Sequence, residues 1–121
     1  MQEKKIFIFD DSEDLLELCT IVLEERGYLL KTSVTSNNIV EQVSSFMPDI
    51  IFMDNWLPDV SGIIATQQIK SCDALKHIPV IYFTANNNVM ELAQEAGADD
   101  YLAKPFDISD LENIAKKYLG K

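Results

Sequence analysis

The sequence predicts an α/β fold in which a doubly wound, five-stranded parallel sheet carries helices on both faces. Two observations predict this fold. First, five short apolar runs alternate with stretches in which apolar residues recur at the helical period, as in repeated βαβ units. Second, 121 residues with 47% hydrophobic content suit one core and leave no room for another. The apolar runs are KIFIF, YLLKTSV, DIIFM, PVIYFT and DYLAK, at 5–9, 28–34, 49–53, 79–84 and 100–104.

The first strand, 5–9, is followed by a helix that is expected to end before Gly27, where left-handed geometry suits a helix terminus. Its apolar stripe consists of Leu15, Leu18, Cys19, Val22 and Leu23. After the strand at 28–34, the pair Ser36/Asn37 is a start signal for a second helix, and Pro48 stops it. The second stripe consists of Ile39, Val40, Val43, Phe46 and Met47.

The third helix, from about Ser61 to Ser71, has a less regular pattern and follows the strand at 49–53. After the strand at 79–84, a fourth helix is expected to end at Gly97. Asp107 is the expected N-cap of the last helix, which follows the strand at 100–104. The stripes of these last two helices are Val89, Leu92, Ala93 and Ala96, and Leu111, Ile114, Ala115, Tyr118 and Leu119.

The charge, hydropathy and cysteine content of the chain exclude several classes of protein. The chain is expected to be a single domain, 1–121, and its net charge of -10 is the wrong sign for binding nucleic acid directly. It contains no apolar stretch long enough to span a bilayer and no signal-peptide pattern, so a cytoplasmic protein without a membrane partner is expected. Cys19 and Cys72 lack C-x-x-C spacing and are expected to be reduced thiols that pack as small apolar groups.

Polar residues stand where four of the predicted strands end. Asp10 and Asp11 follow the first strand, Asp54 ends the third, Thr84 the fourth and Lys104 the fifth. Sites in open parallel sheets form at the carboxyl ends of the strands, so these five residues should converge on one rim. Three carboxylates and one ammonium sum to roughly -2, which a divalent cation would neutralise. Hard oxygen ligands favour Mg²⁺, for which Mn²⁺ may substitute, over zinc.

The hydroxyl and the ammonium at this rim suit the oxygens of a transferring phosphoryl group, and a carboxylate can be the nucleophile. Taken singly, the residues have plainer explanations. Asp11 or Ser12 suits an N-cap, Asp54 a turn, Thr84 a strand end and Lys104 the surface. Their occurrence together at successive strand ends is what indicates a site.

The segments FIFDD, IIFMDNWLPDVSG, IPVIYFTA and GADDYLAKPF resemble, in this order and spacing, the receiver domain of two-component response regulators. The resemblance implies a flavodoxin-like fold with strand order 2-1-3-4-5 and no output domain in this chain. It implies Asp54 as phosphoacceptor, with Asp10, Asp11 and the backbone carbonyl of Trp56 completing the metal site. It also implies contacts from Thr84 and Lys104 to the phosphoryl oxygens.

The same resemblance implies a switch and its partners. Thr84 and Tyr101 would be the switch residues, the Lys104–Pro105 bond would be cis, and Gly62 would match the family glycine before the third helix. The phosphoryl donor would be a sensor histidine kinase or a histidine phosphotransfer protein. A downstream protein would bind the face made by the fourth helix, the fifth strand and the fifth helix. The domain would be a monomer or weak dimer, and would catalyse its own phosphoryl transfer and slow autodephosphorylation without being a conventional enzyme.

Three other classes of protein share parts of this pattern. The closest is a pseudo-receiver that binds a protein without phosphorylation. A haloacid dehalogenase-type phosphohydrolase needs a second acid two residues after the first, where this chain has Ser12, and an FMN carrier would meet repulsion from Asp10 and Asp11. Asn55, Trp56 and Asn86 depart from common receiver residues and flank the phosphoryl site, so they bear on its lifetime.

Two further features are expected to lie away from this site. The acidic pair Asp99/Asp100 precedes its strand, which predicts solvated turn acids at the opposite edge of the sheet. His77 precedes the strand at 79–84, which predicts a loop histidine far from the site.

Overall fold

The computed structural model describes residues 3–85 and 87–120, so Asn86 lies outside the described residues. Within these ranges the chain forms five parallel strands that alternate with five helices. The elements are β1 (Lys5–Phe9), α1 (Glu13–Glu25), β2 (Leu29–Ser33), α2 (Ile39–Phe46), β3 (Ile50–Asp54), α3 (Gly62–Lys70), β4 (Val80–Thr84), α4 (Val89–Ala96), β5 (Asp100–Ala103) and α5 (Ile108–Leu119). The strand order is β2-β1-β3-β4-β5. The predicted α/β fold and its strand order are confirmed.

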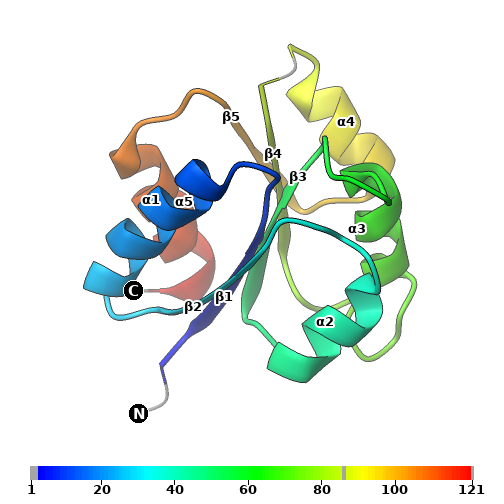
Figure 1. Cartoon of the computed structure of the whole chain (residues 1–121), viewed down its shortest axis with the longest axis horizontal. Helices are drawn as coiled ribbons and strands as arrows, with labels where there is room; N and C mark the ends of the chain where they lie inside the picture. Colours follow the sequence, from blue (N-terminus) through cyan, green and yellow to red (C-terminus); the bar gives the residue numbers. More distant parts are fainter. Residues whose placement is uncertain (1–2, 86, 121) are drawn as a thin grey trace.

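The sheet lies between two helical layers. Figure 1 shows α1 and α5 on one face of the sheet and α2, α3 and α4 on the other. Alternate side chains of a strand enter opposite layers, so Phe7 and Phe9 pack toward α2, α3 and α4, whereas Ile6 and Ile8 pack toward α1 and α5. Both faces are therefore apolar, which explains why β1, β3 and β4 are continuous apolar runs.

Local capping signals set most of the helix boundaries. The Ser12 hydroxyl accepts a hydrogen bond from the Leu15 N–H at the start of α1, and Ser61 does the same for Ile64 in α3. Asp107 forms a capping box with Asp110 at the start of α5, as its sequence position predicted. Gly27 and Gly97 follow α1 and α4 with positive φ, so the expected helix ends are confirmed.

The predicted start signal of the second helix, Ser36/Asn37, lies one to two residues before the observed N-cap, Asn38. Helix α2 begins at Ile39, and Ser36 is buried with its hydroxyl donating to the carbonyl of Val60. This hydroxyl therefore joins the β2–α2 and β3–α3 loops instead of capping a helix.

The stripe predicted for α1 was also partly wrong. Leu18 is 47% exposed, whereas Leu16 is buried. The buried residues Leu16, Cys19, Val22 and Leu23 centre the docked face about a third of a turn away from Leu18. Sequence periodicity gave a helix here but misplaced the edge of its buried face.

The acidic pair at the start of β5 lies at the opposite edge of the sheet from the carboxyl ends, but its members are not merely solvated turn acids. Asp99 accepts a hydrogen bond from the Val80 N–H at 2.8 Å and pairs with Lys70 at 2.6 Å. Asp100 pairs with Lys117 at 2.9 Å. The two carboxylates thus tie the amino end of β5 to β4, α3 and α5, which the expectation of solvated acids missed.

The histidine and the two cysteines take no part in the carboxylate cluster that the structure describes. His77 lies in an exposed turn before β4. Cys19 is buried in α1 and Cys72 is half-buried after α3, and neither is in a disulfide. Burial, followed by the charge of Asp10, raises the pKa of the Cys19 thiol to about 11, so it packs as a neutral group. Among the described helices, none has the length and apolar character needed to cross a membrane.

Candidate functional site

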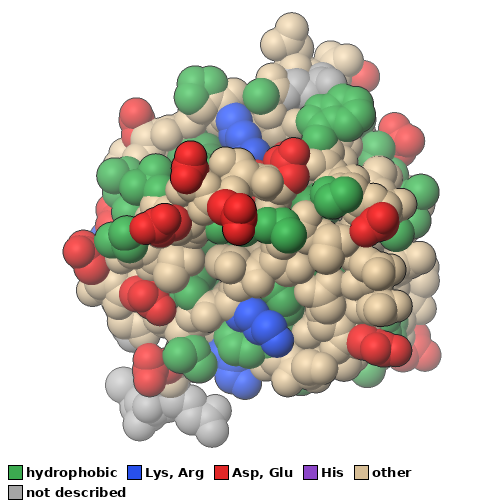
Figure 2. All heavy atoms as spheres, viewed as in Figure 1, with side chains coloured by type: hydrophobic (Ala, Val, Ile, Leu, Met, Phe, Trp, Pro, Cys, Tyr) green, Lys and Arg blue, Asp and Glu red, His purple; other side chains and the backbone are tan. Residues whose placement is uncertain are grey.

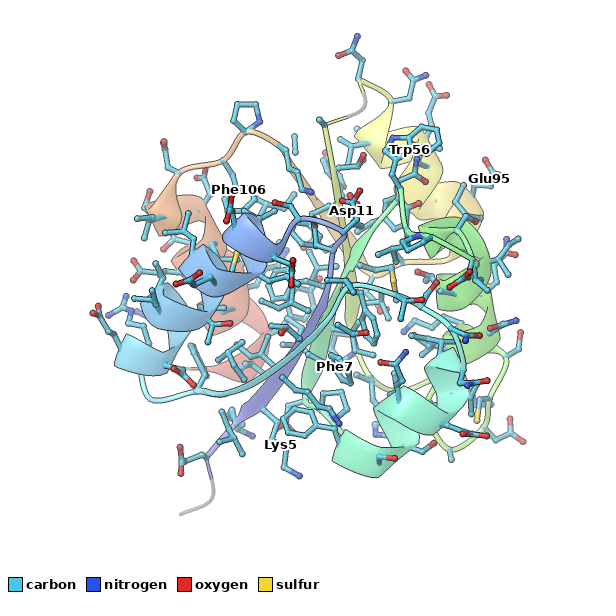
Figure 3. The ribbon with its side chains drawn as sticks, in the orientation of Figure 1. Lys5, Phe7, Asp11, Trp56, Glu95 and Phe106 are labelled. Carbon is cyan, nitrogen blue, oxygen red and sulfur yellow. The ribbon has the colours of Figure 1, made fainter. Side chains whose placement is uncertain are left out.

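The five polar residues at the strand ends gather at the carboxyl edge of the sheet. Strands β1, β3, β4 and β5 are neighbours, so Asp10, Asp54, Thr84 and Lys104 stand side by side at their ends. Figure 3 shows Asp11 at this edge with Trp56 nearby, whereas Lys5 lies at the far end of β1. The structure therefore brings the predicted site residues together through strand order alone.

Three carboxylates form the floor and one side of the site. One oxygen from each of Asp10, Asp11 and Asp54 lies within 4.8 Å of the others. Asp10 and Asp54 are buried and Asp11 is exposed, so the cluster opens toward solvent on the Asp11 side. The Ser12 N–H donates to Asp10 Oδ1 at 2.8 Å and fixes that carboxylate beside the start of α1.

Lys104 spans two of these carboxylates. Its ammonium lies 2.5 Å from Asp10 Oδ2 and 3.3 Å from Asp54 Oδ1, and 4.6 Å from the ring centroid of Phe83. The Lys104 backbone N–H donates to the Thr84 carbonyl at 3.0 Å, and the Lys104–Pro105 bond is cis. The lysine thus stands next to Asp54 and is in position to contact a group attached to it.

The acid cluster holds more negative charge than Lys104 offsets. Burial, followed by the charge of Asp10, raises the pKa of Asp54 to about 6, against the lowering effect of Lys104. A cation among these oxygens would relieve the repulsion, and three carboxylates are the hard ligands that Mg²⁺ or Mn²⁺ prefers. The donor set and its charge therefore fit a divalent metal.

The end of β3 lies against the start of α3. A Cβ atom at Gly62 would lie 2.0 Å from the Asp54 carbonyl oxygen, so a side chain does not fit there. The Gly62 N–H donates to the Asn55 carbonyl at 3.1 Å. The glycine thus permits a close contact that holds the backbone around Asp54.

The other predicted residues surround this centre in different ways. Thr84 is fully buried at the end of β4, next to the carboxylate cluster. Tyr101 is 38% exposed in β5, beside Tyr82 of β4. Trp56 is 68% exposed, and its indole projects from the loop after β3 (Figure 3). The indole of Trp56 is therefore exposed to solvent near the mouth of the site.

Sequence reasoning missed one polar contact beside the site. The hydroxyl of Tyr82, a fully buried residue in β4, donates to the side-chain carbonyl of Asn55. A signal was present, because a tyrosine within the apolar run VIYFT needs a partner for its hydroxyl when it is buried. The partner could not be named, because it follows a different strand.

Residues 6–116 match the family described as "Response regulator receiver domain". The chain belongs to this family. The polar-differentiation response regulator DivK of Brucella anthropi is 34% identical over 121 residues, 97% of this chain and 97% of DivK. The DNA-binding dual master transcriptional regulator RpaA of Synechocystis is 33% identical over 109 residues, 88% of this chain. This receiver spans only 45% of the length of RpaA.

Solved receiver structures have the same fold. The receiver domain of a sensor histidine kinase from Pseudomonas aeruginosa, with a magnesium ion coordinated in its active-site cleft, superposes with a TM-score of 0.89. It is 28% identical and the match covers 99% of this chain and 100% of that one. Receivers are signalling modules of two-component systems and not conventional enzymes, so the site described above belongs to a signalling domain.

Proposed function

We propose that this receiver accepts a phosphoryl group on Asp54 in a Mg²⁺-dependent reaction and thereby changes which protein it binds. The observation that carries the proposal is the placement of Asp54, which is buried beside Asp10 and Asp11 and lies 3.3 Å from the ammonium of Lys104. A nucleophilic carboxylate with a metal site on one side and an ammonium on the other is the arrangement that phosphoryl transfer requires.

Asp10, Asp11, Asp54 and the backbone carbonyl of Trp56 are the proposed metal ligands, directly or through water. When bound, Mg²⁺ would neutralise charge on the carboxylates and on the phosphoryl oxygens. The magnesium ion in the related Pseudomonas aeruginosa receiver supports this assignment. The raised pKa of Asp54 supports it from this chain alone, since burial and like charges leave that carboxylate in need of a cation.

In the proposed transfer an Asp54 carboxylate oxygen attacks the phosphorus of a phosphohistidine. The new P–O bond forms as the P–N bond breaks, and the electron pair of that bond leaves with the imidazole, which is then protonated from water. Lys104 gives up its contact with Asp54 and donates to a phosphoryl oxygen, while the Thr84 hydroxyl donates to another. In the slow autodephosphorylation, water attacks phosphorus, a new P–O bond forms as the P–O bond to Asp54 breaks, and inorganic phosphate leaves while the Asp54 carboxylate is restored.

The proposed donor is a sensor histidine kinase or a histidine phosphotransfer protein. Thr84, drawn toward the phosphoryl group, and Tyr101, now 38% exposed, would shift the face made by α4, β5 and α5 between two arrangements, and a downstream protein would bind one of them. We further propose that residues 1–121 form one domain, that this domain acts in the cytoplasm and that it is a monomer or weak dimer. RpaA is described as DNA-binding, but a charge of -10 argues against direct binding of nucleic acid by this chain.

The test is phosphorylation by acetyl phosphate, measured by intact mass with and without EDTA. Wild-type protein should gain one acid-labile phosphoryl group only when Mg²⁺ is present, and Asp54→Asn should gain none. Equal labelling of Asp54→Asn would identify another nucleophile and contradict the proposal. No labelling of wild type, together with no Mg²⁺ binding at millimolar concentration, would favour the pseudo-receiver, which binds its partner without phosphorylation.

A further inference from the structure

The hydrogen bond between Tyr82 and Asn55 joins the middle of the sheet to the loop beside the acceptor. We infer that these two residues form a positioning pair that holds the β3–α3 loop in the geometry needed for metal binding. The inference rests on the proposed function and adds to it two residues that touch neither the phosphoryl group nor the metal.

The pair lies within the protein, away from bulk solvent. Tyr82 is fully buried, and Asn55 is 7% exposed. Burial, followed by the charge of Asp54, raises the pKa of the Tyr82 phenol, so the hydroxyl stays protonated and donates to Asn55 Oδ1. Tyr82 lies beside Met53 of β3 and belongs with Leu57 to the core layer formed with α2, α3 and α4. Its ring is thus held by packing while its hydroxyl points to the loop.

Burying a polar pair costs free energy unless both partners are hydrogen-bonded. Because a hydrogen bond is directional, such a pair can also orient the groups that make it. Removing one partner leaves the other desolvated and unpaired. An apolar side chain at either position would fill space but would not fix the rotation of the adjoining peptide. The hydrogen bond restricts that rotation, because it holds the Asn55 side chain toward Tyr82 and so limits the backbone torsions at Asn55.

The loop is anchored on both sides of the proposed metal ligand. Asn55 is held through its side chain by Tyr82 and through its carbonyl by the Gly62 N–H, at 3.1 Å. Leu57 is buried in the core, whereas the indole of Trp56 between them is 68% exposed. The direction of the Trp56 carbonyl is therefore set by its two neighbours and not by packing of its own side chain.

The first test is Tyr82→Phe, which removes only the hydroxyl. Mg²⁺ affinity, followed by fluorescence of the single tryptophan and by calorimetry, should fall about 10-fold, since residues that orient metal ligands have effects of this size. In metal-free protein, exchange of the Gly62 amide hydrogen should accelerate about 10-fold more than exchange of the Ile51 amide in β3, which reports the loss of global stability.

Tyr118→Phe is the matched control, because it removes a tyrosine hydroxyl that donates to Asp100 at 2.9 Å near the opposite edge. It should leave both Mg²⁺ affinity and Gly62 exchange at wild-type values. The double variant Tyr82→Phe with Asn55→Leu removes both polar groups, so its stability should recover while its Mg²⁺ affinity stays low. Recovery of both would mean that the pair only avoids an unpaired group, and would overturn the inference.

The two proposals can fail separately. If wild type binds Mg²⁺ and Tyr82→Phe binds it equally well, the positioning role is wrong and the proposed function stands. If wild type shows no saturable Mg²⁺ binding by fluorescence or calorimetry, the proposed function fails and the positioning role fails with it. Unchanged Gly62 exchange in Tyr82→Phe would also contradict the positioning role, independently of any metal.

Discussion

At the scale of single residues, the features that suit Asp54 to act as a nucleophile also lower the stability of the folded protein. Its burial excludes water, and its acidic neighbours make it part of the proposed metal site, but both effects raise its pKa from 3.8 to about 6. A raised folded pKa means that the folded state binds the proton more tightly than the unfolded chain does. The ionised carboxylate that the reaction needs therefore opposes folding when no metal is present.

Asp54→Asn should consequently stabilise the metal-free protein at neutral pH. The favourable contribution of the Asp54 proton is complete below about pH 4 and is lost as the pH rises to about 6. The stability of the variant relative to wild type should therefore increase across this window, reach about 1 to 3 kcal/mol, and stay constant above it. Urea unfolding in EDTA between pH 4 and pH 8 measures this difference. A stability difference that does not change with pH would show that folding does not raise the pKa of Asp54.

At the scale of elements, the junction of β3 and α3 depends on a glycine for a steric reason. Gly62 is absent from the residues with positive φ, but its missing Cβ leaves room for the Asp54 carbonyl oxygen. Gly97 is the opposite case, because its φ is +82° and nothing lies within 4 Å of a Cβ built there. The two glycines are needed for different reasons, and only the first touches the site.

Gly62→Ala should therefore destabilise the protein more than Gly97→Ala does. The new Cβ at position 62 would lie 2.0 Å from a backbone oxygen, so α3 must move, at a cost of about 3 kcal/mol or more. Alanine at position 97 costs about 1 kcal/mol, because only backbone strain opposes it. Urea unfolding of both variants tests this order. Equal losses would mean that α3 has room to shift.

The elements also show what a sequence can and cannot predict. Ser12 and Asp107 act within one turn of their own helices, so local signals located them. The fold and the gathering of Asp10, Asp54 and Lys104 followed from strand periodicity and from the resemblance to receivers. Contacts between elements could not be predicted, because they depend on how those elements pack. Asp99 pairs with Lys70 across 29 residues and Tyr82 reaches Asn55 across 27, and no local pattern names such partners.

At the scale of the whole molecule, the excess of negative charge attracts cations to the entire surface and not only to the proposed metal site. Twenty acids oppose ten bases, and Figure 2 shows acidic side chains scattered over the face in view with few basic ones among them. Such a surface repels itself, so NaCl should also stabilise the fold, by screening. A specific metal site must therefore be distinguished from general screening by cations.

Thermal unfolding in MgCl₂ and in NaCl of equal ionic strength makes this distinction. Mg²⁺ at ten times its dissociation constant should stabilise the wild type by about 1.4 kcal/mol beyond NaCl, which raises the melting temperature by about 5 °C. Asp11→Asn should lose most of this extra rise, because it removes a proposed ligand. Glu24→Gln changes the net charge equally from an exposed position near the end of α1, and should keep the extra rise. An equal response of the two variants would mean that Mg²⁺ acts on the overall charge and not at Asp10, Asp11 and Asp54.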